Sequence, residues 1–580
     1  VRCRVLDAVA DAPRAADWDP LAAEFVGDGQ NVVVARRLLR ALAAVIHVID
    51  GDKAARAESL LAAGGEPSIV LARWARLVPL LMRGDEPVFN DKAAVKQLRK
   101  ALRSSSTAAR AAAARALRLA GGESALAAAL EHFPNETAPT VQLQLVETVA
   151  ALREPTTPEA GKWLAAIATG DYGEDVRERA IVRLGRSGAK EATSALVKAL
   201  DDRSWQLAVC AAVSLGKTDA DEAFAPLQRM LKHADWKMRG AAVVGLMHWS
   251  RPEIVEPLIV MLEDADPVVA GAAHHALCTV SRRYETKFAV KDWRAWWGEA
   301  KGKHDFTDRE ATLDKLKKYG YAVPDSEIYQ GLDVIVFESR GDHIEQLLTR
   351  LEIAHRLTKQ GEIPESGVHP EAIFVSNCTG ELDGKDEEPL AWYVRTGGSL
   401  FGSCWALSET IARIHPGVMQ KANTNGQVLD NVRALPVDAT SPLLTGVFPD
   451  GVVPIYHLEG AHLIDVLDPE RCEVLIDSPD SAERHGNGNL AAWFFSGHGV
   501  MFDSANHFDL QGLGLAGKLK KGEERQAYAI DHLGLSFASW RETRGDGFWR
   551  NPKKAAEEVA DLSAFRLLTN FVRSKRMGVY

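Results

Sequence analysis

The clearest pattern in this chain is a step of 31 residues between small and apolar positions. Alanines recur at this step, and leucines four positions further on recur with them: Ala180, Ala211, Ala242 and Ala273, then Leu184, Leu215, Leu246 and Leu277. A segment before each of these keeps the same step: Leu196, Leu227 and Leu258, with Leu200, Leu231 and Leu262. A fixed period of this size predicts a solenoid of stacked helix pairs. Solenoids offer extended binding surfaces and seldom carry out chemistry themselves.

Within one repeat, the pattern predicts two antiparallel helices joined by a short turn. The first helix carries Leu196 and Leu200, and the second runs from Trp205 to Leu215. Gly216 follows the last apolar position, where we expect a left-handed helix cap that needs a residue without a side chain. Ala211 is small because helices of adjacent repeats approach closely there.

These residues resemble HEAT repeats, in particular the short variety of phycobilin-lyase-like proteins. The pair Val176 and Arg177, followed by Ala180 and Leu184, matches the usual repeat pattern. The resemblance is strong for residues 174–280 and weaker upstream, where residues 1–100 are irregular, as terminal repeats often are. We therefore predict an all-α HEAT-type solenoid over residues 1–300 that binds a protein partner.

Three tryptophans near residue 300 have two interpretations. Trp293, Trp296 and Trp297 fall on one helical face. They form either an aromatic ligand patch or a hydrophobic cap that closes the last repeat, and we favour the cap because terminal repeats need one. His274 and His275 are adjacent, so a helix points them in different directions and a metal site there is not expected.

After a linker at residues 301–330, the pattern changes to alternating strands and helices. Strands are predicted at 333–337, 372–375 and 398–402, and helices at 343–358, 388–394 and 408–414. This alternation predicts an α/β domain with a mostly parallel sheet, over residues 331–580 with a C-terminal extension that ends in a helix at 562–573. The carboxyl ends of parallel strands share one edge, which places Glu338 and the segments 376–380 and 402–406 together. We expect any small-molecule ligand to bind at that edge.

The segment 397–406 (GGSLFGSCWA) carries most of the chemical interest. A sharp turn from a strand into a helix exposes its central residue, here Cys404, and the helix dipole stabilises a thiolate there. His507, two residues before Asp509, is the predicted base with its orienting acid, and His498 is a competing base. The loop with Asn377, Cys378, Thr379 and Gly380 is the predicted source of oxyanion donors.

This second part resembles the class I glutamine amidotransferase-like superfamily, and within it the ThuA-like branch. Three segments carry the resemblance: the elbow around Cys404, the segment 441–446 (SPLLTG) and the segment 499–509 (GVMFDSANHFD). The resemblance implies a flavodoxin-like fold, with Cys404, His507 and Asp509 as nucleophile, base and orienting acid. Trp405, directly after the cysteine, is a departure that fills the substrate position, and the chain shows no synthetase partner domain. The ThuA-like branch also points towards carbohydrate metabolism, although no residue argues for a sugar.

Each of these residues also has a structural interpretation. Cys404 is either a nucleophile or a small turn residue, and His507 either a base or a hydrogen-bonding residue of the sheet edge. Glu338 either tunes the thiol or is a solvated loop residue. Cys378 forms a disulfide with Cys404 if their two loops meet at the sheet edge, a distance that sequence does not give.

Composition narrows the function classes. The 580 residues carry a net charge of −10, which argues against a general nucleic-acid binder, and no apolar run is long enough to span a bilayer. The six cysteines show no metal-ligand spacing, so we expect no metal and no cofactor. Reduced thiols fit the cytoplasm, and Val1 at the start also fits export after removal of a leader.

The predicted function is an interaction scaffold whose second domain is a binding or non-catalytic module; the alternative is a cysteine-dependent hydrolase or amidase.

Overall fold

The computed structural model describes most of the chain. The described residues are 2–26, 32–62, 67–83, 85–153, 158–185, 190–218, 220–249, 251–283, 286–306, 329, 332–351, 353–424, 426–439, 441–448, 453–508 and 552–577. They form two compact units, Val1–Asp202 and Arg203–Tyr580. Among the described residues, no helix is both long and apolar enough to cross a membrane.

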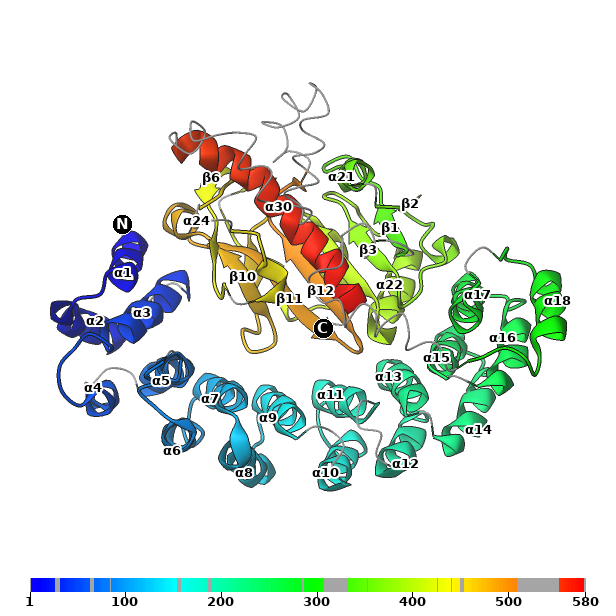
Figure 1. Ribbon diagram of the computed structural model, residues 1–580, viewed down its shortest axis with the longest axis horizontal. Coiled ribbons are helices and arrows are strands. Elements are labelled where there is room, and N and C mark those ends of the chain that lie inside the picture. Colours follow the sequence, from blue (N-terminus) through cyan, green and yellow to red (C-terminus); the bar gives the residue numbers. More distant parts are fainter. Residues whose placement is uncertain are drawn as a thin grey trace. The chain divides into compact units, whose positions relative to one another are not determined.

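The first unit is made of helices that stack side by side in pairs (Figure 1). Its α-helices are α1 (Arg2–Asp11), α2 (Trp18–Val26), α3 (Val32–Val45), α4 (Lys53–Ser59), α5 (Pro67–Leu81), α6 (Asp91–Ala101), α7 (Thr107–Ala120), α8 (Gly122–His132), α9 (Pro139–Leu152), α10 (Pro158–Ala168), α11 (Glu174–Gly185) and α12 (Lys190–Ala199).

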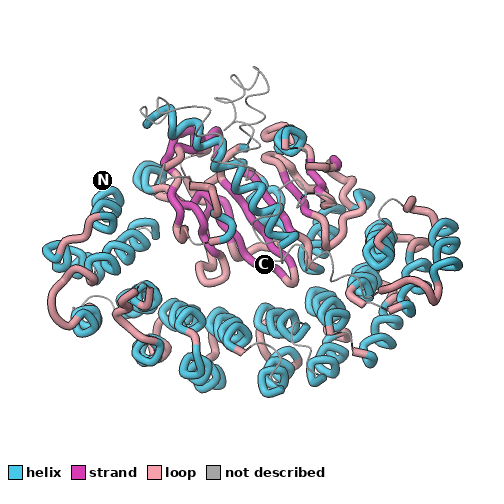
Figure 2. Tube along the Cα trace, viewed as in Figure 1, coloured by secondary structure: helices cyan, strands magenta, loops and turns pink. Residues whose placement is uncertain are grey.

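The second unit begins with further repeat helices and continues into a sheet, whose strands are magenta in Figure 2. Its repeat helices are α13 (Trp205–Lys217), α14 (Asp221–Met230), α15 (Trp236–Met247), α16 (Val255–Met261), α17 (Pro267–Ser281) and α18 (Val290–Ala300). Its later helices are α21 (Ile344–Arg350), α22 (Gly384–Thr396), α23 (Ala412–Ile414), α24 (Pro479–His485) and α30 (Pro552–Met577). The change from helices to strands falls in the predicted linker, of which residues 307–328 lie outside the described ones.

The 31-residue step of the sequence is the step of the helices. Helices α11, α13, α15 and α17 begin at Glu174, Trp205, Trp236 and Pro267, and the alanines and leucines of the pattern that lie on these four helices are fully buried. The residues that cap these helices keep the step too. Ser204, Asp235 and Asp266 each accept a hydrogen bond from a backbone N–H in the first turn of the helix that follows. The predicted helical solenoid is confirmed, and polar caps fix where its helices begin.

Gly216 has a different role from the predicted left-handed cap. Helix α13 continues through it to Lys217, and Gly216 is not among the glycines with positive φ. A Cβ atom on Gly216 would lie 2.0 Å from the backbone oxygen of Gly245 in α15. The glycine is therefore needed because two helix backbones touch at this position.

Helix α18 supports the interpretation of its tryptophans as a cap. Trp293 and Trp297 are 0% and 4% exposed. The Trp296 ring contacts the rings of Trp293 and Trp297, and the Trp297 ring contacts Phe306. These rings close the end of the repeat array against α16, as the pattern predicts for a terminal repeat.

The sheet has eight strands in the order β2-β1-β3-β4-β12-β11-β10-β7. They are β2 (Arg356–Thr358), β1 (Val334–Phe337), β3 (Ile373–Ser376), β4 (Ser399–Ser403), β12 (Gly499–Ser504), β11 (Asn489–Ser496), β10 (Glu473–Asp477) and β7 (Leu435–Pro436). The first five are parallel, whereas β11, β10 and β7 add antiparallel. Two small antiparallel pairs, β5 (Met419–Lys421) with β9 (Ile464–Val466) and β6 (Val428–Arg433) with β8 (Ile455–Ala461), complete the domain. The predicted sheet is thus parallel in one half only.

The predicted helix 343–358 is too long. Helix α21 ends at Arg350, and the chain then forms β2 beside β1. Leu357 is 48% exposed while Thr358 is buried, which is the alternation of a strand. Only three residues of β2 show this pattern, too few to be recognised in the sequence.

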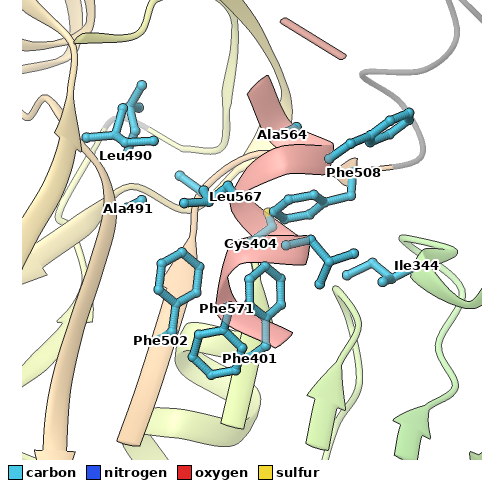
Figure 3. Close-up of a cluster of buried hydrophobic side chains, with 14 of the residues drawn as sticks. Ile344, Phe401, Cys404, Leu490, Ala491, Phe502, Phe508, Ala564, Leu567 and Phe571 are labelled. Carbon is cyan, nitrogen blue, oxygen red and sulfur yellow. The ribbon is translucent and has the colours of Figure 1, made fainter. Parts of the chain in front are cut away.

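Helices cover both faces of the sheet. Helix α30 lies across one face, where Phe571 contacts Phe401 and Phe502 (Figure 3). Helix α22 covers the other face and also contacts α13 and α15 of the repeats. Its Trp392 is fully buried, and its indole N–H donates a hydrogen bond to the Lys237 carbonyl at 3.0 Å. A Cβ atom on Gly240 would lie 2.8 Å from the Trp392 ring, so the repeat helix makes room for this side chain.

Candidate functional site

The backbone turn at Cys404 forms as the sequence predicts, but the turn buries Cys404, where the prediction was an exposed residue. Strand β4 ends at Ser403, Cys404 has a φ of 53°, and the one-turn helix η6 (Leu407–Ile411) follows. The Cys404 N–H donates a hydrogen bond to the Ser504 carbonyl of β12 at 2.7 Å, which fixes the turn. A positive φ at a residue with a Cβ is strained and is typical of functional sites.

The structure brings Cys378 and His507 to this elbow. One ligand atom from each of Cys378, Cys404 and His507 lies within 4.8 Å of the other two. Cys378 follows β3, Cys404 follows β4 and His507 follows β12, so three neighbouring parallel strands supply the cluster at the edge where they end, here called the carboxyl edge. All three are buried, at 2%, 0% and 6% exposure, and Figure 3 shows Cys404 beside Phe401 and Phe508 under α30.

The two thiols have opposite acidities. The pKa of Cys378 is lowered to about 5 because its sulfur accepts a hydrogen bond from the Cys404 thiol and lies beside the His507 ring, which together outweigh burial. The pKa of Cys404 is raised well above its ordinary value, first by burial and then by the neighbouring Cys378. This arrangement favours Cys378 as the thiolate of the pair, with the Cys404 thiol donating to it. The sequence instead predicts Cys404 as the thiolate and Cys378 as part of the oxyanion loop.

The predicted oxyanion loop uses its donors internally. The Cys378 N–H donates to Ser403 Oγ at 3.0 Å, and the Gly380 N–H donates to the Asn377 carbonyl at 3.0 Å. The Asn377 side-chain amide donates to Glu345 at 3.0 Å, and Thr379 has a φ of 65°. The Trp405 N–H, which follows the elbow residue and would hold an oxyanion in a nucleophile elbow, instead donates to the Cys378 sulfur.

The Trp405 side chain is held beside the elbow by two contacts. Its ring stacks on His462, with centroids 4.5 Å apart and planes 8° from parallel, and its indole N–H donates to the Gly460 carbonyl at 2.8 Å. The Cys404 sulfur lies 3.9 Å from the same carbonyl. Burial lowers the pKa of His462 to about 4. Nothing in the sequence pattern distinguishes His462, because it lies in a loop between two short strands.

Two further residues near His507 in the chain have buried side-chain atoms without a hydrogen-bond partner among the described residues. Asp503, at the end of β12, is fully buried, and neither of its carboxylate oxygens has a hydrogen-bond partner among the described residues. Burial, and then the negative charge of Cys378, raise the pKa of Asp503 well above its ordinary value. The side-chain nitrogen of Asn506 is likewise buried without a partner in the described part of the chain. The signal in the sequence is an acid inside an otherwise apolar strand.

The other predicted residues lie elsewhere. Glu338 forms an ion pair with the exposed Lys359 at 3.6 Å. His498 lies where β12 begins, at the opposite edge of the sheet, and contacts Ser214 at 2.9 Å and Lys217 at 3.1 Å in α13. Asp509 is outside the described residues.

A cavity of about 640 Å³ lies at the edge where the parallel strands begin, here called the amino edge. It is lined by α17, by the segment between α17 and α18, and by the starts of β1, β2 and β3 with the residues before them. The lining residues include Phe288, Asp333, Arg356, Glu365, His369 and Glu371. His275 of α17 stacks on His369 with centroids 3.4 Å apart. His275 contacts Glu371 at 2.8 Å, and Asp333 binds His369 at 2.9 Å and Arg356 at 2.8 Å. This edge therefore offers an open cavity whose main charges are paired.

Comparison with known proteins identifies part of the repeat array. The family model for HEAT repeats matches residues 161–236, from within α10 to the start of α15, and no curated protein sequence matches the chain. Human deoxyhypusine hydroxylase in complex with glycerol is 17% identical over 46% of this chain and 96% of its own, with a TM-score of 0.20. Kap121p bound to Nup53p is 14% identical over 56% of this chain, with a TM-score of 0.36, and the chain spans 41% of Kap121p. At these TM-scores the two likenesses carry no argument. The HEAT repeats predicted from the sequence are confirmed over residues 161–236.

Proposed function

We propose that this protein is a scaffold whose HEAT repeats bind a protein partner and whose α/β domain is a binding module joined to them. HEAT repeats form extended surfaces, and a solenoid rarely carries catalytic groups of its own. The contact of α22 with α13 and α15 supports this proposal, because it packs repeat helices of the second unit against the sheet domain.

The single observation that carries the proposal is the cavity at the amino edge. It lies between a repeat helix and the strands, and Phe288 on its border is 53% exposed. Exposed aromatic side chains beside a concave surface are typical of protein-binding sites. Three acids of the lining are paired: Asp264 with Arg239, Asp333 with Arg356 and Glu371 with His275. Glu365 is a further acid of the lining, so the fitting partner segment is apolar with one basic residue that faces Glu365.

The α/β domain is, in this proposal, a member of the class I glutamine amidotransferase-like superfamily with a flavodoxin-like core, close to the ThuA-like branch. The elbow at Cys404 and the order of β1, β3, β4 and β12 support the relation. A binding role is favoured over catalysis because the thiols are covered and the Trp405 N–H is used by Cys378.

The experiment is a comparison of partner capture by full-length variants. Proteins retained by the wild type are compared with those retained by Phe288→Ala combined with Glu365→Lys, and by Leu119→Ala as a control at an exposed position of the first unit. We expect a partner to be lost only from the double variant. A partner retained by all three would place the binding surface elsewhere, and the absence of any saturable partner would contradict the scaffold function.

The second candidate function is a cysteine-dependent hydrolase or amidase. It is favoured by the strained elbow conformation of Cys404 and by the nearness of His507. A screen of small amides and esters tests it, with His507→Gln and Cys404→Ala as inactive variants and Cys472→Ser as the active control. Activity that survives in Cys404→Ala would exclude this cysteine as the nucleophile.

A further inference from the structure

The cluster at the carboxyl edge has the composition of a metal site. It brings two cysteine sulfurs and one histidine nitrogen within 4.8 Å of one another, all from buried residues. Zinc prefers these ligand types, with Zn–S distances of about 2.3 Å and Zn–N distances of about 2.0 Å, which holds neighbouring ligand atoms roughly 3.5–3.8 Å apart. The three ligand atoms, all within 4.8 Å of one another, are already close to that spacing.

The surroundings also fit a cation. Asp503 is fully buried next to the cysteines, and its two oxygens have no hydrogen-bond partner in the described part of the chain. A buried carboxyl without a partner is costly, and a nearby cation compensates its charge. The Trp405 N–H at the Cys378 sulfur is the kind of outer contact that orients a metal ligand.

We propose that Cys378, Cys404 and His507 bind one zinc ion, with Asp503 as a nearby negative charge that strengthens binding. The three ligands leave the fourth position of a tetrahedral ion for water or a substrate group. Each cysteine gives up its thiol proton to solvent when it binds the metal. The ligands come from the ends of three different strands, so they have none of the close spacing by which zinc sites are recognised in a sequence.

The test is metal titration of the full-length, reduced protein. Cobalt(II) replaces zinc as a probe because thiolate ligands give it a characteristic charge-transfer absorption, and a chromophoric chelator in competition then gives the zinc affinity. We expect one equivalent to bind, with affinity more than about 100-fold weaker in Cys378→Ser and His507→Gln, and about tenfold weaker in Asp503→Asn. Cys472→Ser, another buried cysteine outside the cluster, should bind like the wild type.

Two results would overturn the proposal. One is a fully reduced wild-type protein that shows no charge-transfer band with cobalt(II) and no rise in unfolding temperature with zinc. This measurement uses the wild type alone, so it does not depend on whether a variant folds. The other is equal affinity in Cys378→Ser and the wild type. If the reduced protein binds no metal and peptide mapping after exposure to air shows a disulfide between Cys378 and Cys404, the pair is a redox dithiol instead. The partner-capture experiment tests residues at the amino edge, whereas metal titration tests the carboxyl edge. A negative result in one experiment therefore does not decide the other.

Discussion

The two edges of the sheet differ in how many of their buried polar side chains have hydrogen-bond partners. At the amino edge, Asp333 accepts hydrogen bonds from Arg356 and His369, and His275 binds Glu371. One atom there, His369 Nδ1, is buried without a partner among the described residues. At the carboxyl edge, Asp503 and the Asn506 side-chain nitrogen are buried without partners among the described residues. Paired groups stabilise the fold, whereas groups left without partners reduce stability and persist where a function needs them. The comparison predicts that substitutions at the two edges change stability in opposite directions.

The largest expected effect is at the amino edge. Asp333→Ala removes the shared acceptor of Arg356 and the buried His369, and should lower the free energy of unfolding by about 3 kcal/mol. Urea unfolding measures it. Glu338→Ala, which removes an exposed ion pair with Lys359 just after the same strand, is the matched control with an expected change below about 0.5 kcal/mol. Equal losses in the two variants would contradict the distinction.

The amino edge should also make the protein less stable in acid. Burial, and then the charge of His275, lower the pKa of His369 to about 4 in the folded protein. Unfolded histidine titrates near pH 6.5, so between these values the unfolded state binds more protons and stability falls as pH falls. We expect a loss of about 2 kcal/mol between pH 6.5 and 4.5.

The acid effect has a direct control in His369→Gln, which keeps a hydrogen-bonding side chain but does not titrate. Its stability should be flatter over the same pH range. Burial alone raises the pKa of Asp333, but hydrogen bonds from His369 and Arg356 lower it well below its ordinary value. A carboxyl of this kind loses its contribution below about pH 4, so the two effects separate along the pH axis.

At the carboxyl edge, the expected sign is reversed. Asp503→Ala removes a buried carboxyl that has no described partner, and should raise the free energy of unfolding by about 1 kcal/mol when a chelator is present. With zinc present, the free energy of unfolding of the wild type should rise by about the same amount, so that the variant is no longer the more stable protein. A variant that is less stable than the wild type in chelator would show that Asp503 has a structural partner.

The smallest expected effect concerns the strained elbow. Cys404 has a φ of 53°, a conformation that glycine adopts without cost. Cys404→Gly should therefore be more stable than Cys404→Ala by about 1 kcal/mol or less. Both variants lack the thiol, so the difference between their free energies of unfolding in urea measures the contribution of backbone strain. Equal stabilities would mean that the turn is not strained.

The sequence predicted the elements of this fold better than their contacts. The starts of α11, α13, α15 and α17 follow from a periodic burial pattern, and β1, β3 and β4 follow from apolar runs. Strand β2 and the antiparallel strands β10 and β11 were missed, because their pairing depends on neighbours that are distant in the chain. The role of Gly216 was wrong, since backbone contact with Gly245 has no local signal.

For the candidate site, the sequence placed Cys378, Cys404 and His507 in three separate loops and left open whether the cysteines meet. The parallel register of β3, β4 and β12 brings them together, and a register is not visible in the residues themselves. Neither Asp503 nor His462 was predicted, since their importance comes from burial and stacking. Each motif alone was compatible with Cys404, His507 and Asp509 as nucleophile, base and orienting acid. In the structure the Trp405 N–H, which would hold an oxyanion, instead donates to the Cys378 sulfur.

The contact of Trp392 with the repeats has a practical consequence for dividing the chain. Trp392 is fully buried where Gly240 makes room for it, and its indole binds the Lys237 carbonyl. A gene cut between α18 and β1, where helices give way to strands, would expose this aromatic side chain on one fragment and its apolar socket on the other. Both fragments would tend to self-associate, so the borders of separately expressible pieces do not follow the change in secondary structure.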